Sequence, residues 1–525
     1  MTGEHFPWRP PLAEDWGERM AEIEALIAEG QEPDYAAIKV LANQQLGLRE
    51  QVKLERLATK LHKSGLMPAA FTPAKVGLLG SRTLSYLPGP LAAAGLARGL
   101  AISAPEAPYD SVASYAYSPM DCFSQPLDAL LVVLDESGFS GRRAMLDRAA
   151  ENAALAEAAD LVIALAAAAR EKSGCSAIFA TLPGSEQVSS SDLATPSSSA
   201  RFRQRLNLLL ADGASEGKWL LWDQAALANR VGFDRWFDPV RYHAAKIPFS
   251  IDVCPLAADN IAALLAAMKG KAGRALVLDL DNTLWGGVIG DDGLAGIRLG
   301  QNSPEGEAFV AFQNFILGLR DRGIVLAVCS KNTDAIAREP FRDHSEMVIK
   351  EDHVAVFQAN WNDKATNIKT IAETLSLGLE SLVFVDDNAA ERERVRQELP
   401  LVSTIEVGDD PSFFIQRIAQ SGVFDHLPLN QEDIARAESY GGRAAAAEIR
   451  AKIGNYEDYL TSLDMRMTIA PFDEEGRSRI TQLINKSNQF NLTTRRYGEE
   501  EVRELEADAG VLGWQMRLED KFAKH

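Results

Sequence analysis

A buried strand pattern that ends in two aspartates constrains this chain more than any other feature. Residues 275–284 read Ala-Leu-Val-Leu-Asp-Leu-Asp-Asn-Thr-Leu, so an apolar run delivers Asp279 and Asp281 with one residue between them. Burying two carboxylates inside a sheet would be costly. At the carboxyl end of a parallel strand they would instead lie in the crevice where open α/β sheets bind ligands. The alternative is a pair of solvated carboxylates at a strand end.

In three later segments, polar residues stand either at the end of a predicted strand or at the start of a predicted helix. An apolar run over residues 324–328 predicts a second strand, a helical period begins at residue 364, and residues 381–385 predict a third strand. The polar residues at these three points are Cys329 with Ser330, then Lys364, then Asp386 with Asp387. Carboxyl ends of parallel strands share one edge of a sheet, which is where ligands bind.

In this order the four segments resemble the motifs of the haloacid dehalogenase (HAD) superfamily. The resemblance implies that Asp279 attacks phosphorus and forms an aspartyl-phosphate. It implies that Asp281 protonates the leaving group and later activates water. Ser330 would donate to a phosphoryl oxygen, and Lys364 would hold the nucleophile and the phosphate by charge.

Mg²⁺ is the cofactor that the resemblance implies. This ion takes oxygen ligands and keeps several waters. The expected ligands are the Asp279 carboxylate, the Asp281 carbonyl and Asp386, with Asp387 beside them. Without a cation the carboxylates would repel one another and raise each other's pKa values.

The HAD part leaves no room for a cap domain. An insertion would have to lie between Asp279 and Ser330 or between Ser330 and Lys364. The first of these gaps must already hold residues 285–293, predicted as a hairpin flap with an Asp-Gly turn, and a helix over residues 305–322. An uncapped site is open, and so fits a phosphate or acyl group carried on a large partner.

Several longer sequence motifs make the family resemblance more specific. They are Trp285-Gly-Gly-Val288, Gly290-Asp-Asp-Gly293, Trp361-x-x-Lys364, Glu391-Arg392 and Asn485-Lys-Ser-Asn-Gln-Phe-Asn-Leu-Thr-Thr-Arg-Arg-Tyr497. These strings are similar to the FkbH-like branch of HAD subfamily IIIC. Such proteins remove phosphate from 1,3-bisphosphoglycerate and load the glyceryl group onto the phosphopantetheine thiol of an acyl carrier protein. This step supplies polyketide pathways, including the route to methoxymalonyl units.

The resemblance leaves two interpretations of Cys329. As a thiolate it would take the glyceryl group as a thioester, which needs a pKa lowered by Lys331, Lys364 and the metal. Alternatively it is a small hydrophobe in a buried strand. Without a thioester, the chain would be a plain phosphatase acting on an exposed or macromolecular phosphate. A third alternative is a scaffold that binds a carrier protein without turnover, and the intact motifs argue against it.

The resemblance also divides the chain into four parts. Residues 1–70 are expected to be helical, residues 71–255 to form an SGNH-hydrolase-like α/β domain, residues 256–425 to form the HAD domain, and residues 426–525 to form a partial GNAT-like segment. The expected fold class is therefore multidomain α/β, with a capless, Rossmann-like parallel HAD sheet. The last part lacks the glycine loop that binds the CoA pyrophosphate, so acetyl transfer is not expected.

The SGNH-like part is not expected to be an active esterase. Ser81 follows a strand pattern, as the nucleophile of such an enzyme does. The Asp-x-x-His pair that would activate it is missing, because Arg241 stands three residues after Asp238 and His243 stands five after it. A packing or carrier-docking role is expected instead.

Charge and composition exclude several classes of partner. The net charge of −20 and the pI near 4.9 argue against binding to a nucleic-acid backbone or an anionic membrane. Four cysteines without metal-site or disulfide spacing are typical of a reducing cytoplasm. No N-terminal signal is evident. The apolar stretch over residues 153–169 contains Glu157 and Asp160, which predicts a soluble helix rather than a membrane span.

Overall fold

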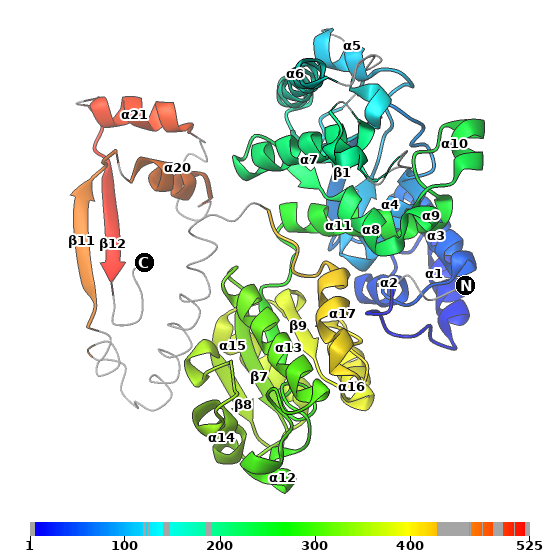
Figure 1. Cartoon of the computed structure of the whole chain (residues 1–525). Helices are drawn as coiled ribbons and strands as arrows, with labels where there is room; N and C mark the ends of the chain where they lie inside the picture. The colour runs from blue at the N-terminus through cyan, green and yellow to red at the C-terminus, as the bar shows by residue number, and fades with distance from the viewer. Residues whose placement is uncertain are drawn as a thin grey trace.

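Two parallel sheets, each covered by helices, organise the chain (Figure 1). The computed structural model describes residues 6–427 apart from 119–121, 124, 140–146, 185–188, 190 and 197, and then residues 461, 464–474, 476–486, 497–508 and 510–519. Within these residues each parallel sheet has five strands, and a two-stranded antiparallel ribbon lies near the C-terminus. The expected multidomain α/β fold class is therefore confirmed.

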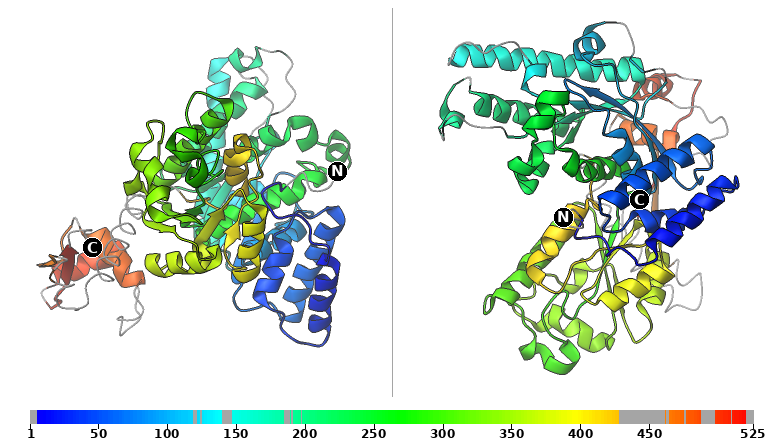
Figure 2. Two further views of the ribbon diagram at one scale, coloured as in Figure 1. Left: turned by 90° about the horizontal axis from the view of Figure 1, so that it is seen from below. Right: turned by 90° about the vertical axis from the view of Figure 1, so that its right-hand side faces the viewer.

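The first helices pack into a small bundle, in blue at the lower right of the left-hand view of Figure 2. They are α1 (Trp16–Ala28), α2 (Tyr35–Ala42) and α3 (Leu48–Ser64). The buried residues of α1 recur at the spacing of an amphipathic helix; they are Trp16, Met20, Ile23 and Ile27. Together with α4 (Pro88–Ala97) these helices share one hydrophobic core.

The first sheet has the strand order β2-β1-β3-β4-β5, and all neighbouring strands are parallel. Its strands are β1 (Thr72–Gly80), β2 (Leu100–Ser103), β3 (Ala129–Val133), β4 (Ser176–Ala180) and β5 (Leu220–Trp222). Strand-like runs over residues 75–81, 129–134, 177–182 and 219–222 predict all of them except β2. That strand follows directly on the apolar helix α4, so no change of hydrophobic period separates the two.

Helices cover both faces of this sheet. They are α4, α5 (Val112–Tyr117), α6 (Arg148–Ser173), α7 (Ser199–Ser215), α8 (Gln224–Val231), α9 (Phe233–Trp236), α10 (Pro239–Ala245) and α11 (Cys254–Met268). Alternate residues of β3 enter different cores, as side chains on a strand must. Leu130 and Val132 join the core of α5, α6 and α7, whereas Leu131 joins that of α4, α8 and α11.

Two helical segments are long and apolar enough to cross a membrane by length and composition alone, Arg148–Ser173 and Ile251–Met268. Both contribute to the cores of the first sheet. Val162 and Leu165 of the former and Ile261 and Leu265 of the latter are buried there. Packing against the folded core thus explains their composition, in agreement with the soluble helix predicted over residues 153–169.

The second sheet has the strand order β10-β9-β6-β7-β8, again with parallel neighbours. Its strands are β6 (Ala275–Leu278), β7 (Val325–Ser330), β8 (Val356–Ala359), β9 (Leu382–Val385) and β10 (Ser403–Thr404). Its helices are α13 (Pro304–Arg320), α14 (Asp334–Asp343), α15 (Lys364–Leu375), α16 (Ala389–Glu398) and α17 (Phe414–Ser421). α13, α14 and α17 cover one face, and α15 and α16 cover the other. The central strand β6 thus brings its carboxyl end between those of β7 and β9.

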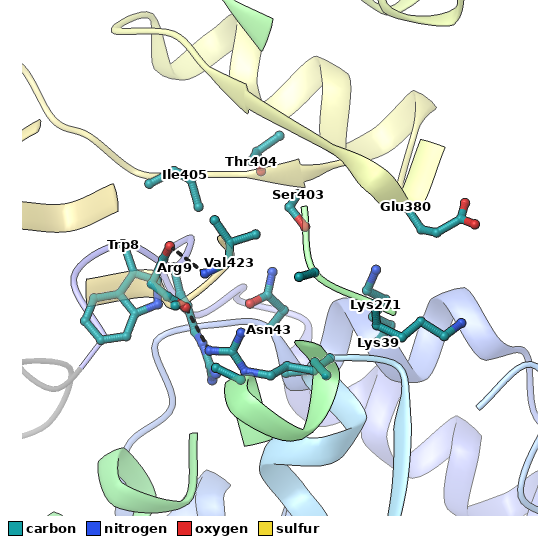
Figure 3. Close-up of a pocket in the computed structure, with 17 residues that line it drawn as sticks. Trp8, Arg9, Lys39, Asn43, Lys271, Glu380, Ser403, Thr404, Ile405 and Val423 are labelled. Carbon is teal, nitrogen blue, oxygen red and sulfur yellow. Dashed lines mark hydrogen bonds between the residues drawn. The ribbon is translucent and has the colours of Figure 1, made fainter. Parts of the chain in front are cut away.

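The N-terminal region contacts the edge of the second sheet, as Figure 3 shows. The Glu406 amide donates to the Trp8 carbonyl at 2.9 Å. Lys39 Nζ donates to the Leu401 carbonyl at 3.4 Å. Each of these two hydrogen bonds joins residues far apart in sequence. They hold the N-terminal region against the second sheet.

A buried ion triad lies near the same junction. Asp259 of α11 is 2% exposed and pairs with Arg9 at 2.5 Å and with Arg98 at 2.8 Å. Arg98 also donates to the Ser421 carbonyl of α17 at 2.8 Å. Burial alone would raise the pKa of Asp259, but the charges of Arg98 and Arg9 lower that pKa below its usual value. The triad therefore joins three distant segments through one ionised carboxylate.

Replacing Asp259 by alanine should lower the free energy of unfolding by about 3–5 kcal/mol at neutral pH, because two buried arginines lose their counter-charge. The lowered pKa means that this stabilisation is present above pH about 4 and is lost as the pH falls through the folded-state pKa. Urea unfolding at several pH values measures it. Asp15→Ala, which breaks an exposed pair with Arg19, is the control and should have little effect. Equal stabilities of the two variants would contradict the assignment.

The C-terminal ribbon pairs β11 (Arg466–Pro471) with β12 (Trp514–Glu519). Helices α20 (Arg477–Lys486) and α21 (Glu499–Ala507) lie between these strands in sequence. Most of the string predicted from residue 485 to residue 497 lies outside the described residues. The GNAT-like assignment of residues 426–525 stays a prediction.

Candidate active site

Asp279 is the first residue after the central strand β6. Its amide donates to the Val385 carbonyl at 3.0 Å, which continues the pairing of β6 with β9 past the end of the strand. The residue is 6% exposed. Its carboxylate is therefore held at the edge of the sheet, between the ends of two neighbouring strands.

Lys364 links the carboxylates that follow these two strands. Its Nζ lies 2.8 Å from Asp279 Oδ1 and 2.5 Å from Asp386 Oδ2. Lys364 is the first residue of α15 and is 3% exposed. Burial alone would lower its pKa, but the charges of Asp279 and Asp386 raise that pKa above its usual value. A permanent cation thus stands among the acids, as the sequence predicted for Lys364.

Asp279, Asp386 and Asp387 form a compact acidic cluster. Each offers a carboxylate oxygen, and these oxygens lie within 4.8 Å of one another. Burial and the charge of Asp279 raise the pKa of Asp386 to about 7, against the opposing charge of Lys364. Burial and the Asp279 charge also raise the pKa of Asp387. One lysine does not compensate three carboxylates, so the oxygen donors fit a hard divalent cation.

The Asp281 carboxylate is directed toward the segment that follows it rather than into the acidic cluster. Its Oδ1 accepts hydrogen bonds from Trp285 Nε1 at 3.0 Å and from the Ile289 amide at 2.9 Å. Its Oδ2 accepts one from Asn332 Nδ2 at 3.3 Å. Burial is the main cause that raises the pKa of Asp281. The predicted acid–base role of this carboxyl group and the predicted role of the Asp281 carbonyl as a metal ligand both stay predictions.

The flap after this motif differs from the predicted hairpin. Gly286 and Arg298 form an antiparallel bridge at its base, but its tip is the short helical segment α12 (Ile289–Gly296), which is kinked at Gly293, where φ is 64°. The reason is local: Asp281 accepts from the Ile289 amide, and Asp292 Oδ2 accepts from the Val288 amide at 2.8 Å. Side-chain acceptors for these amides favour the start of a helix over a turn.

No cap domain is inserted between residues 279 and 364, all of which the structure describes. From residue 279 to residue 364, a stretch that is described throughout, the helices are α12, α13 and α14 together with one short 3-10 turn. α13 and α14 cover the sheet face, and α12 forms the flap. Within this stretch the chain thus holds no inserted domain, and the open site expected from the sequence stays a prediction.

Cys329 and Ser330 are the last two residues of β7, and both are buried. Ser330 is buried at the end of the strand, and its carbonyl accepts from the Asn360 amide at 3.2 Å. Cys329 is 0% exposed and belongs to the core under α15, where its Sγ lies 3.7 Å from the Lys364 carbonyl. Burial raises the pKa of the Cys329 thiol, although the Lys364 charge opposes this. These features favour the interpretation of Cys329 as a core residue, and its role as an acyl carrier stays a prediction.

Several supporting residues were not singled out from the sequence. Asn332 binds Asp281, and Thr283 Oγ1 accepts from the Asp387 amide at 3.2 Å. Arg392 donates to the carbonyls of Asp386 and Asp387 at 2.6 and 2.7 Å. These bonds hold the two acidic loops in place. Asn332 and Arg392 lie in or beside the recognised motifs. The sequence does not indicate that Asn332 binds Asp281 or that Arg392 binds the carbonyls after β9.

In the first sheet, Ser81 is not placed as an esterase nucleophile. Its Oγ donates to Asp135 Oδ1 at 3.0 Å. Asp238 caps α10 by accepting from the Arg241 amide at 3.0 Å, and His243 contacts the ring of Tyr242 edge-on at 5.4 Å. Among the described residues no hydrogen bond joins Ser81 to a histidine. The arrangement is compatible with the predicted absence of esterase activity.

Among solved structures, the chain is similar to the N-terminal part of the protein BF1531 from Bacteroides fragilis, which contains a phosphatase domain and is complexed with Mg. The two chains are 31% identical, with a TM-score of 0.65. The match covers 71% of this chain and 98% of that chain. No protein-family model matches the sequence, and no curated protein matches it. The similarity thus spans nearly all of that structure.

Proposed function

The chain belongs to the HAD phosphatases, and from this premise we propose that it is a Mg²⁺-dependent enzyme that transfers phosphoryl groups to Asp279. The observation that carries this proposal is the position of Lys364 Nζ between Asp279 and Asp386. Asp387 completes a set of oxygens within 4.8 Å. Mg²⁺ bound by these acids would neutralise charge on the phosphoryl oxygens.

The proposed reaction has two steps. A carboxylate oxygen of Asp279 attacks phosphorus, the bond from phosphorus to the leaving oxygen breaks, and Asp281 gives that oxygen a proton. Water then attacks the phosphorus of the aspartyl-phosphate, Asp281 takes the proton of the water, and phosphate leaves with the Asp279 carboxylate restored. Lys364 stays charged throughout and holds the nucleophile, while the Ser330 hydroxyl donates to the phosphoryl group.

The resemblance to FkbH-like proteins supports a more specific proposal. The thiol of a phosphopantetheinylated acyl carrier protein attacks the C1 carbonyl of 1,3-bisphosphoglycerate, the C1–O bond breaks, and phosphate leaves with the thiol proton. The 3-phosphate is then hydrolysed at Asp279, which leaves a glyceryl thioester on the carrier. The uncapped site supports a large, carrier-bound substrate. Four cysteines that form no disulfide in the described part of the chain, together with the acidic net charge, support a cytoplasmic location without nucleic-acid or membrane partners.

Mass spectrometry of an intact carrier tests this proposal. Wild-type protein, Mg²⁺, 1,3-bisphosphoglycerate and a holo-carrier should yield a glyceryl adduct on the carrier thiol, and EDTA should stop the loss of the 3-phosphate. The apo-carrier, which lacks the thiol, is the control. If phosphate is released while every holo-carrier tested stays unmodified, the glyceryl-loading proposal is wrong.

A plain phosphatase acting on an exposed or macromolecular phosphate is the second candidate. The burial of Cys329 argues against a thioester on this residue, because a buried neutral thiol is a poor nucleophile, and a plain phosphatase needs no such thioester. A non-catalytic scaffold would show no phosphate release with any substrate.

Cys329→Ala separates direct attack by the carrier thiol from a covalent route through Cys329. If Cys329 only packs in the core, the variant should load the carrier at a rate close to wild type, with a stability loss of about 1 kcal/mol. If it carries the acyl group, carrier loading should stop while phosphate release continues. A hydroxylamine-sensitive adduct on the peptide that contains Cys329, formed without carrier, would establish the covalent route.

A further inference from the structure

A second cavity lies in the first sheet, away from the acidic cluster. Its volume is about 750 Å³, and it opens where β1, β3 and β4 end. Cavities of roughly 300–1,000 Å³ are typical of small-molecule sites. The strand order places β2 and β3 on opposite sides of β1, which makes this edge the switch point where open α/β sheets bind ligands. The proposed phosphoryl transfer makes no use of it.

The polar wall of this cavity is built around Asp135. Its Oδ1 accepts from Ser81 Oγ at 3.0 Å, and its Oδ2 accepts from Arg82 Nε at 2.5 Å and from the Tyr242 hydroxyl at 3.4 Å. The Asp135 amide in turn donates to Ser81 Oγ at 3.0 Å. This network fixes the Ser81 hydroxyl, so the wall is organised for binding rather than for nucleophilic attack.

Both arginines of the cavity wall are paired with carboxylates, and Asp192 adds a third acid to the wall. Arg82 pairs with Asp135, and Arg203 of α7 pairs with Glu136. The Arg203 side chain is largely buried. Because each of these guanidinium groups already has a carboxylate partner, the wall offers no uncompensated positive charge to a phosphate, nucleotide or carboxylate. An uncharged ligand is favoured.

The opposite wall is apolar and aromatic. It includes Phe233 and Phe237, whose rings stack with centroids 5.7 Å apart, together with Leu182 and Trp236. Trp236 is 0% exposed, and in the described part of the chain its Nε1 has no hydrogen-bond partner. A buried donor without an acceptor is costly. Because the indole is fully enclosed, this donor lies behind the wall and is not offered to a ligand in the cavity.

We propose that this cavity binds an uncharged amphipathic chain of the pantetheine class. Pantetheine has a methylated body that suits the aromatic wall, and hydroxyl and amide groups that suit the network around Asp135. Pantetheine carries no charge, which suits a wall whose two arginines are already paired with carboxylates. The choice of pantetheine among such chains rests on the proposed carrier partner, whereas the cavity itself is independent of phosphoryl transfer.

Isothermal titration calorimetry with free pantetheine tests this site. The matched variants are Ser199→Trp and Ser215→Trp, at the two ends of the same helix, α7, and both serines are exposed. Ser199 lines the cavity, whereas Ser215 does not contribute to it. Wild type and Ser215→Trp should bind pantetheine alike, and Ser199→Trp should weaken the affinity by about tenfold or more because the indole occupies the cavity.

All titrations are repeated in EDTA, which removes Mg²⁺ and so prevents phosphoryl transfer. Pantetheine binding can therefore be interpreted even if the proposed function is wrong. Titrations with holo-carrier and with coenzyme A then distinguish the two sources of a pantetheine arm. The proposal is supported if either one binds to wild type and binds more weakly to Ser199→Trp. Absence of pantetheine binding to wild type, or equal binding by Ser199→Trp and Ser215→Trp, would overturn it.

Discussion

Replacing Asp279 by asparagine is expected to reduce Mg²⁺-dependent phosphate release by on the order of a thousandfold or more. The amide cannot attack phosphorus. Asp279 is the carboxylate that directly follows the central strand β6, whereas Asp281 is bound to the flap and Asp386 and Asp387 follow β9. Phosphate release from p-nitrophenyl phosphate and from 1,3-bisphosphoglycerate measures the loss.

Asp291→Asn is the matched control, because Asp291 is an exposed acid on the flap helix α12. It should retain phosphate release close to that of the wild type. Circular dichroism on both variants excludes unfolding as the cause. Native-rate phosphate release by Asp279→Asn would contradict the assignment of the nucleophile.

Replacing Lys364 by methionine is expected to affect stability as well as activity. The side chain keeps its length but loses its charge, which leaves three buried or half-buried carboxylates without a cation. In EDTA the free energy of unfolding should fall by about 3–5 kcal/mol, as for other broken buried ion pairs. Mg²⁺ should restore part of this loss, since an ion that binds only the folded state stabilises it. Urea unfolding with EDTA and with Mg²⁺ measures both effects.

Lys369→Met provides the control on the same helix, because Lys369 is exposed. Its stability should stay close to wild type in either condition. If Lys364→Met is as stable as Lys369→Met in EDTA, the buried lysine does not compensate the acidic cluster, and the electrostatic basis of the site is wrong.

Much of the second sheet could be predicted from the sequence. Three of its strands, β6, β7 and β9, end in polar residues after clear apolar runs, and the structure brings Asp279, Lys364 and Asp386 together. β8 and β10 were not predicted. β10 is only two residues long, which is too short to show a period. β8 is as long as β6 and β9, but its two middle positions are partly exposed and one of them is Gln358, so no continuous apolar run marks it.

The residues that hold the site in place could not be predicted, because their partners are distant in sequence. Arg392 is one of several arginines on α16, and only the fold directs it to the carbonyls after β9. The burial of Cys329 depends on strand alternation, which turns it away from its neighbour Ser330. The cavity in the first sheet is likewise formed by residues from β3, α7 and α9 that no sequence motif connects.

Borohydride trapping of the phosphorylated enzyme tests the central claim most directly. Borohydride reduces an aspartyl-phosphate to homoserine, and peptide mass spectrometry identifies the position. After incubation with substrate and Mg²⁺, homoserine should replace aspartate at residue 279, and EDTA should prevent it. Homoserine at residue 281 instead, or phosphate release at the wild-type rate with no homoserine at residue 279, would contradict phosphoryl transfer to Asp279.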